Sequence, residues 1–152
     1  MIPTRPRLGF TLIEIVVALL IGSILTSSAL SSYGNATARF QARGARDSYA
    51  SMHARARAMA IERGENVRLY LLPSSDRVII TDADATWPYL DDVDFRERFD
   101  VDIQGTNIRI CMNARGYADV DCNSFSGIMQ YQFVVGADSS PLTLLPMGQL
   151  NY

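Results

Sequence analysis

The chain has 152 residues, of which 48% are hydrophobic and 20% charged, enough apolar content for one folded domain and too much for a disordered segment. Its formal net charge of −2 argues against a nucleic-acid binder that acts through overall charge. All 14 basic residues are arginine, which excludes lysine-based catalysis. A single histidine and two cysteines leave little material for a metal site or a histidine-based triad.

The charges are distributed unevenly along the chain. Residues 1–63 hold eight arginines and three acids, a balance of +5, whereas residues 64–152 hold six arginines and thirteen acids, a balance of −7. This division indicates two parts with different environments.

The N-terminus combines a basic leader with an apolar stretch. Residues 1–9 contain two arginines and no acid, and the 21 residues from Phe10 to Leu30 would rise about 31 Å as a helix, enough to cross a bilayer. The arginines should hold the leader in the cytoplasm and place the rest of the chain outside. A cleaved secretory signal, a plain signal anchor and a more specialised segment are the alternatives.

Glu14 separates these alternatives because it lies inside the apolar stretch. A carboxylate at the centre of a membrane helix costs roughly 2.5–3.5 kcal/mol, and less near an end, so it indicates a function and needs a partner. No basic residue lies in the stretch. A cut between Gly9 and Phe10 would create an α-amine one helical turn away, which could pair with Glu14 of the same or a neighbouring helix.

The six residues Gly9 to Glu14, GFTLIE, with the basic leader before them and the apolar helix after them, resemble the type III signal of type IV pilins and pseudopilins. The resemblance implies that a membrane peptidase cuts after Gly9 and N-methylates Phe10, and that Glu14 aids membrane extraction and subunit registration. Many pilins carry proline where this chain has Ser31, which leaves the continuity of the helix open. A signal anchor with a chance glutamate, or a cut after Ala29, remains an alternative.

The remaining pattern predicts a long helix followed by strands. Apolar residues recur at helical spacing up to about Arg63, Gly64 is a predicted C-cap, and residues 66–81 alternate as a hairpin. Residues 82–102 form a predicted acidic, irregular insertion, with Trp87-Pro88-Tyr89 as its anchor. Further strands are predicted over 107–112, 127–135 and 141–145. The predicted fold is therefore α+β and pilin-like, with a leader (1–9), a long helix (10–63, of which 10–30 span the membrane) and a small antiparallel β-sheet head (64–152) packed on the helix.

This part of the chain resembles the GspH/FimT class of minor pilins in the segments AMAIERGENVRLYL, MNARGYAD and LPMGQLNY. That class has an Arg-Gly pair after a middle strand, here Arg115-Gly116, and a Gly-Arg near the C-terminus, here Gly148-Gln149. Some members bind DNA through an arginine-rich C-terminal patch. Because residues 141–152 contain no arginine, that property does not transfer.

Few constellations carry chemistry. With the head outside the cytoplasm, Cys111 and Cys122 favour a disulfide over free thiols or half of a metal site.

The aspartates of the 82–102 insertion raise the question of calcium, but their spacing does not match an EF-hand loop, and a solvated loop is favoured. His53 lacks a second ligand and is interpreted as an ordinary helix-side residue. We expect no catalytic residue, metal or cofactor. The arginines between Arg39 and Arg57 fit a solvated helix face better than a basic binding surface.

These observations predict a minor pilin or pseudopilin, a structural subunit of a type IV pilus or a type II secretion pseudopilus. Its expected partners are other pilin subunits in a helical filament, the prepilin peptidase/N-methyltransferase, the inner membrane and its assembly platform. The expected location is the bacterial inner membrane, with one span and the head in the periplasm, and then the filament. The alternatives are a competence pilin that binds DNA through basic surface residues, and a membrane-anchored periplasmic enzyme.

Overall fold

The computed structural model describes residues 11–84 and 89–151, except the side chain of Ser31. It divides into two compact units, residues 1–36 and residues 37–152. Helix α1 (Leu12–Arg63) supplies the described elements of the first unit and the first element of the second. Its bounds include the serine-rich stretch around Ser31, so the backbone there stays helical without the proline that would remove a hydrogen bond.

Both ends of α1 have local causes. At the N-terminus, the Oγ1 atom of Thr11 accepts a hydrogen bond from the backbone N–H of Glu14 at 3.3 Å, which satisfies one of the free donors of the first turn. At the C-terminus, Gly64 adopts a φ of +67°, a left-handed conformation that glycine enters without steric cost. The predicted cap at Gly64 is confirmed.

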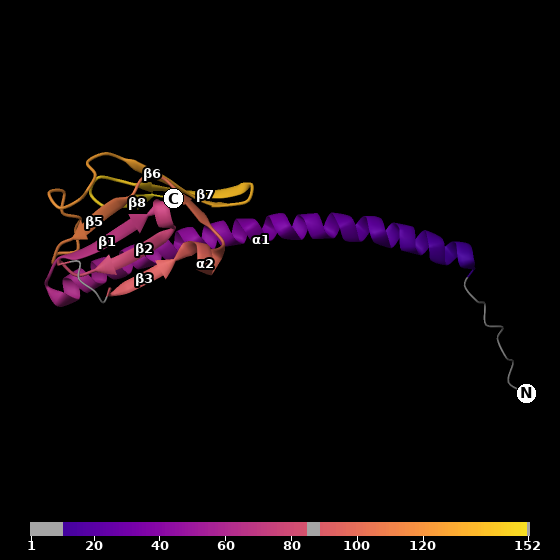
Figure 1. The fold of residues 1–152 in the computed structure, drawn as a ribbon, viewed down its shortest axis with the longest axis horizontal. Helices are drawn as coiled ribbons and strands as arrows, with labels where there is room; N and C mark the ends of the chain where they lie inside the picture. Colours follow the sequence, from indigo (N-terminus) through magenta and orange to yellow (C-terminus); the bar gives the residue numbers. More distant parts are fainter. Residues whose placement is uncertain (1–10, 85–88, 152) are drawn as a thin grey trace, which may run out of the picture. The chain divides into compact units, whose positions relative to one another are not determined.

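The second unit contains two antiparallel four-stranded sheets (Figure 1). The first sheet has the order β3 (Asp91–Asp94), β2 (Arg77–Thr81), β1 (Val67–Leu72) and β5 (Ile108–Met112). The second has the order β4 (Asp102–Gln104), β6 (Met129–Val135), β7 (Asp138–Leu144) and β8 (Leu150–Asn151). A 3₁₀ turn (Pro73–Ser75) joins β1 to β2, and the short helix α2 (Phe95–Phe99) joins β3 to β4. The predicted α+β fold, a long helix followed by a small antiparallel β-sheet domain, is confirmed.

The core of this unit lies between α1 and the two sheets. Six residues of α1 are buried at helical spacing, while β1 buries every second residue, as a strand with one face on a core must. The helix contributes Ala42, Ala45, Tyr49, Met52, Ala56 and Ala60. Every fully buried apolar side chain of the described residues lies between Ala42 and Leu144, so residues 37–152 contain their own core and can fold without the first unit.

The acidic segment 82–102 is more ordered than its sequence predicts. Strand β3 and helix α2 lie within it, and β4 begins at its last residue. The Oδ1 atom of Asp94 accepts the backbone N–H of Glu97 at 2.9 Å and so caps α2. Strand β3 has four residues, too few for a clear alternating pattern. Of the predicted anchor, Trp87 and Pro88 lie outside the described residues, and Tyr89 is partly exposed.

Asp76 links the turn between β1 and β2 to the segment that follows β3. Its side chain is nearly buried, and it accepts the backbone N–H of Ile103 at 2.7 Å and the Nε of Arg96 at 3.0 Å. Its carbonyl oxygen accepts the N–H of Phe95 at 2.7 Å. One carboxylate thus holds α2 and β4 against the first sheet.

Two core tyrosines differ in the hydrogen bonding of their hydroxyl groups, so we expect removal of the hydroxyl to change the free energy of unfolding in opposite directions. Among the described residues, the buried hydroxyl of Tyr49 has no hydrogen-bond partner, whereas that of Tyr131 donates to the carbonyl of Thr106 at 2.9 Å. We expect Tyr49→Phe to raise the free energy of unfolding of residues 37–152 by about 1 kcal/mol, and the matched Tyr131→Phe to lower it by a similar amount. Urea denaturation of the disulfide-bonded fragment measures both changes. A loss of stability in Tyr49→Phe would contradict the prediction.

Candidate functional site

The described part of the first unit is a helix with an apolar surface. Large aliphatic side chains cover it from Leu12, which is 81% exposed, to Leu30, which is 68% exposed, and none of its most apolar window is buried. The helix is long and apolar enough to cross a membrane. An apolar surface of this extent is stable only when lipid or another protein surface replaces water.

Three hydroxyl groups of this segment are satisfied within the helix. Each donates to a backbone carbonyl one turn earlier: Ser23 to Leu20 at 2.8 Å, Thr26 to Gly22 at 2.7 Å and Ser28 to Ile24 at 3.2 Å. These bonds remove the cost of placing a free hydroxyl in an apolar medium, so they suit the helix to such surroundings.

Glu14 lies in the first turn of α1, where the positive end of the helix dipole favours a carboxylate. No basic side chain of the described residues forms an ion pair with it. Thr11 and Glu14 have the spacing of a capping box, a signal that the sequence analysis missed although T-x-x-E is visible in the chain. Gly9 and Phe10, the predicted cleavage and methylation residues, lie outside the described residues.

Residues 4–30 match the family model of the prokaryotic N-terminal methylation motif. The chain carries a type IV pilin-like prepilin signal. This signal is typical of pilin-class proteins that are processed at the N-terminus by a prepilin peptidase and assemble with other pilin subunits, and the family is structural rather than enzymatic. No curated protein and no solved structure matches the chain significantly.

Downstream of the prepilin signal, the second unit contains the predicted disulfide between Cys111 and Cys122. Cys111 is buried on β5, an edge strand of the first sheet. The residues around Cys122 cover this edge, because Asn123 accepts the N–H of Cys111 at 2.9 Å and Ser124 bonds to both backbone groups of Arg109. The cross-link and these bonds protect an edge strand that would otherwise offer free backbone groups to another chain.

Two arginines of α1 pair with acids from other elements of the same unit. Arg39 pairs with Asp138 at 3.0 Å, and Arg55 pairs with Asp91 at 2.6 Å. Both arginine side chains are more than half exposed, so each pair adds little stability. The pairs reduce the positive charge that this helix face would present to an anionic partner.

The described aspartates of β3 have partners within the fold. Asp91 and Asp92 of β3 pair with Arg55 and Arg77, and Asp94 caps α2. Within residues 11–84 and 89–151, no group of three or more His, Cys, Asp or Glu side chains is placed to hold a metal ion. The calcium hypothesis therefore has no support from the described acids.

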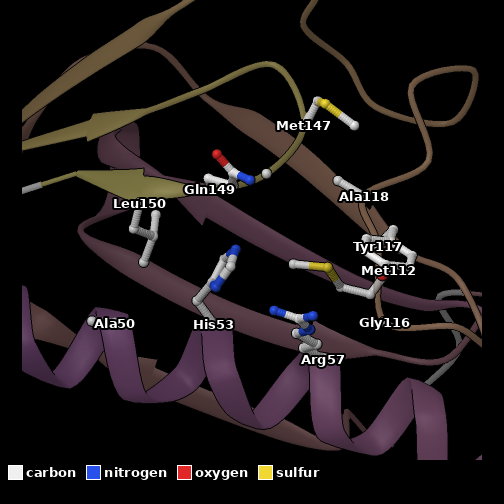
Figure 2. A pocket seen from close by; sticks show the side chains of 11 residues that line it. Ala50, His53, Arg57, Met112, Gly116, Tyr117, Ala118, Met147, Gln149 and Leu150 are labelled. Atoms are coloured by element: carbon white, nitrogen blue, oxygen red, sulfur yellow. The ribbon is translucent and has the colours of Figure 1, made fainter.

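A pocket of about 390 Å³ brings together three distant segments of the second unit (Figure 2). His53 and Arg57 of α1 line it. Residues 116–118 of the loop that the Cys111–Cys122 bond closes, the disulfide loop, and residues 147–150 at the turn between β7 and β8, the C-terminal turn, line it as well. Gly116 of the Arg-Gly pair noted in the sequence and the Gly148-Gln149 pair both line it. Sequence analysis did not find this site, because no local pattern relates segments so far apart.

His53 is more perturbed than an ordinary helix-side residue. Burial lowers the pKa of His53 to about 4, the backbone of Gly148 opposes this shift, and the charge of Arg57 reinforces it. The imidazole is therefore neutral at pH 7 and leaves Arg57 as the charged group of the pocket.

His53 predicts an acid-sensitive component of stability. Because its pKa is lower in the folded unit than its usual value of 6.5, the unfolded chain binds the extra proton, and stability present above pH 6.5 is lost as the pH falls towards 4. The free energy of unfolding of residues 37–152 should fall between pH 7 and pH 4. We expect this fall to be about 2 kcal/mol smaller in His53→Gln than in the wild type. Urea denaturation of both proteins at the two pH values measures this. Equal losses would contradict it.

Proposed function

We propose that this protein is a minor pilin or pseudopilin of the GspH/FimT class, a structural subunit of a type IV pilus or a type II secretion pseudopilus. In this proposal the peptidase cuts after Gly9 and methylates Phe10, α1 anchors the subunit in the inner membrane, and the head lies in the periplasm. Assembly then transfers the helix from lipid to the core of a helical filament, on an inner-membrane assembly platform.

The observation that carries this proposal is the prepilin signal joined to a helix whose apolar side chains are exposed from Leu12 to Leu30. A secretory signal that is removed would not need a helix continuous with the folded head, but α1 extends from Leu12 to Arg63 and supplies six core residues of the second unit. The Cys111–Cys122 disulfide supports a location in an oxidising compartment.

Glu14 gives the assembly step a physical mechanism. A carboxylate in lipid or in an apolar filament core costs free energy unless it is paired, and so does an α-amine. Contact between Glu14 of one subunit and the Phe10 amine of its neighbour would neutralise both charges and fix the axial register of the two helices.

The contacts of the described residues favour this function over DNA uptake. Arg39 and Arg55, which would belong to a DNA-binding helix face, already pair with Asp138 and Asp91. A phosphate backbone would have to displace these intramolecular partners.

Gly9 tests the processing step. We expect Gly9→Val to leave an unprocessed precursor, because the bulky side chain should not fit the peptidase site. Intact mass spectrometry of the membrane protein should show a precursor that retains residues 1–9, while the wild-type chain begins at Phe10. A wild-type chain that begins at Met1, or just after Ala29, would refute the proposal.

Glu14 tests the assembly step and separates charge pairing from helix capping. We expect Glu14→Gln, which keeps a hydrogen-bonding group in the first turn but loses the charge, to be processed normally and to enter filaments at about one-tenth of the wild-type level. The measurement is the ratio of the protein in sheared filaments to that in membranes. As a control for capping, Thr11→Ala should retain most of the incorporation. Normal incorporation of Glu14→Gln would refute the ion pair.

A further inference from the structure

The pocket between α1, the disulfide loop and the C-terminal turn has no role in the function proposed above. Its walls depend on close backbone approaches at two glycines with positive φ, Gly116 at +77° and Gly148 at +76°. A Cβ atom at Gly116 would lie 2.7 Å from Ile61 Cδ1, and one at Gly148 would lie 2.5 Å from the Cβ of Ala118. A larger residue at either position would be strained by the positive φ and by these close approaches, so the two loops need glycine to meet here.

The disulfide loop is held in shape by its own hydrogen bonds. The side-chain oxygen of Asn113 accepts the N–H groups of Arg115 at 3.0 Å and Tyr117 at 3.1 Å, and the Cys111–Cys122 bond closes the loop. The opposite wall is also a tight turn, since the N–H of Leu145 donates to the carbonyl of Gln149 at 2.9 Å. The pocket is thus formed before any ligand arrives, which lowers the entropy cost of binding.

Arg57 is the charged residue among the side chains that line this pocket. Arg39, Arg55, Arg77 and Arg96 each pair with an aspartate, although none of them lines the pocket. Within the described residues, no carboxylate pairs with Arg57, whose guanidinium lies 5.8 Å from the centre of the Tyr117 ring. The charge that lines this pocket therefore has no carboxylate partner within the described residues and is available to an external anion.

Apolar side chains surround this charge. Tyr117 is 59% exposed and Met147 is 65% exposed at the rim, while Met112 and Leu150 line the interior. Figure 2 shows His53 and Arg57 rising from α1 into the space beneath Met147 and Gln149. Exposed aromatic and methionine side chains around one cation match the composition of protein-binding sites, and the volume fits one or two side chains.

We propose that this pocket docks an extended segment of a neighbouring pilin-like subunit, which places a carboxylate beside Arg57 and an apolar side chain between Met112 and Leu150. This inference rests on the proposed function for the identity of the partner, and it adds a head-to-head contact to the helix-mediated assembly. The neutral His53 keeps the interior suited to an apolar group, and Arg57 supplies the selectivity for an acidic one.

The test uses the full chain in cells that assemble the filament. A photo-crosslinking residue, p-benzoylphenylalanine, replaces Met147 at the rim, and in a matched control it replaces Thr106, an exposed residue outside the pocket. We expect the Met147 position to form a cross-link to a second protein whose sequence carries a prepilin signal, and the Thr106 position to form none. Arg57→Glu should lower the yield by about tenfold, Arg57→Gln should lower it less, and Arg57→Lys should retain most of it.

The controls separate this inference from the proposed function. Non-reducing gels report the Cys111–Cys122 bond, and hence folding, in every Arg57 variant. Equal cross-linking at both positions, a yield that Arg57→Glu leaves unchanged, or a cross-link to lipid or to a protein without a prepilin signal would overturn the docking site. If these results come from cells in which the chain is processed and enters filaments, they refute the pocket alone. A chain that is neither processed nor incorporated refutes the proposed function, whatever is cross-linked.

Discussion

The exposed apolar surface of residues 12–30 is the constraint on which the rest of this protein depends. No described residue packs over its most apolar window, and three of its hydroxyl groups, those of Ser23, Thr26 and Ser28, are already bonded to the helix backbone. Such a surface associates with lipid or with other apolar helices because both remove it from water at little polar cost. The prepilin signal at residues 4–30 is consistent with both surroundings, since such signals are typical of membrane-anchored proteins that assemble with other pilin subunits.

One helix serves two different purposes along its length. Its first part presents aliphatic side chains outward, whereas its second part buries alanines, Tyr49 and Met52 against the two sheets. The compact units meet between Ala36 and Thr37, inside α1, and not where the charge balance changes sign near residue 63. The basic and acidic parts of the chain are in fact partners in the second unit, where Arg39 and Arg55 pair with Asp138 and Asp91. The uneven distribution of charge along the sequence therefore arises from ion pairing within the second unit as well as from a division of the chain between two environments.

The same unit shows how a small head can carry a specific surface. The residues around Cys122 cover the edge strand β5, and the disulfide loop lines the pocket with Gly116 and Tyr117. Asp76 meanwhile orders α2 and β4 through bonds to Arg96 and the N–H of Ile103, so an acidic segment that looks irregular becomes part of the fold. A few polar contacts and one cross-link thus cover the edge of β5, order the segment of α2 and β4, and shape the pocket.

The sequence by itself determined the features that depend on local pattern. These are the helix with its cap at Gly64, the hairpin of β1 and β2, the apolar N-terminal stretch, and the GFTLIE signal. Helical and strand periodicity, a positive φ and a contiguous motif can all be read within a short window.

Only the tertiary structure decided what the polar residues do. Strand β3 is too short for its pattern to be recognised, and the partners of its aspartates lie on β2 and on α1. His53 looked ordinary because part of its surroundings comes from Gly148 in the C-terminal turn. Gly116 and Gly148 likewise approach residues of other segments, Ile61 and Ala118. Pairing, burial and pKa depend on which distant segments meet, and that information is absent from any local stretch of the chain.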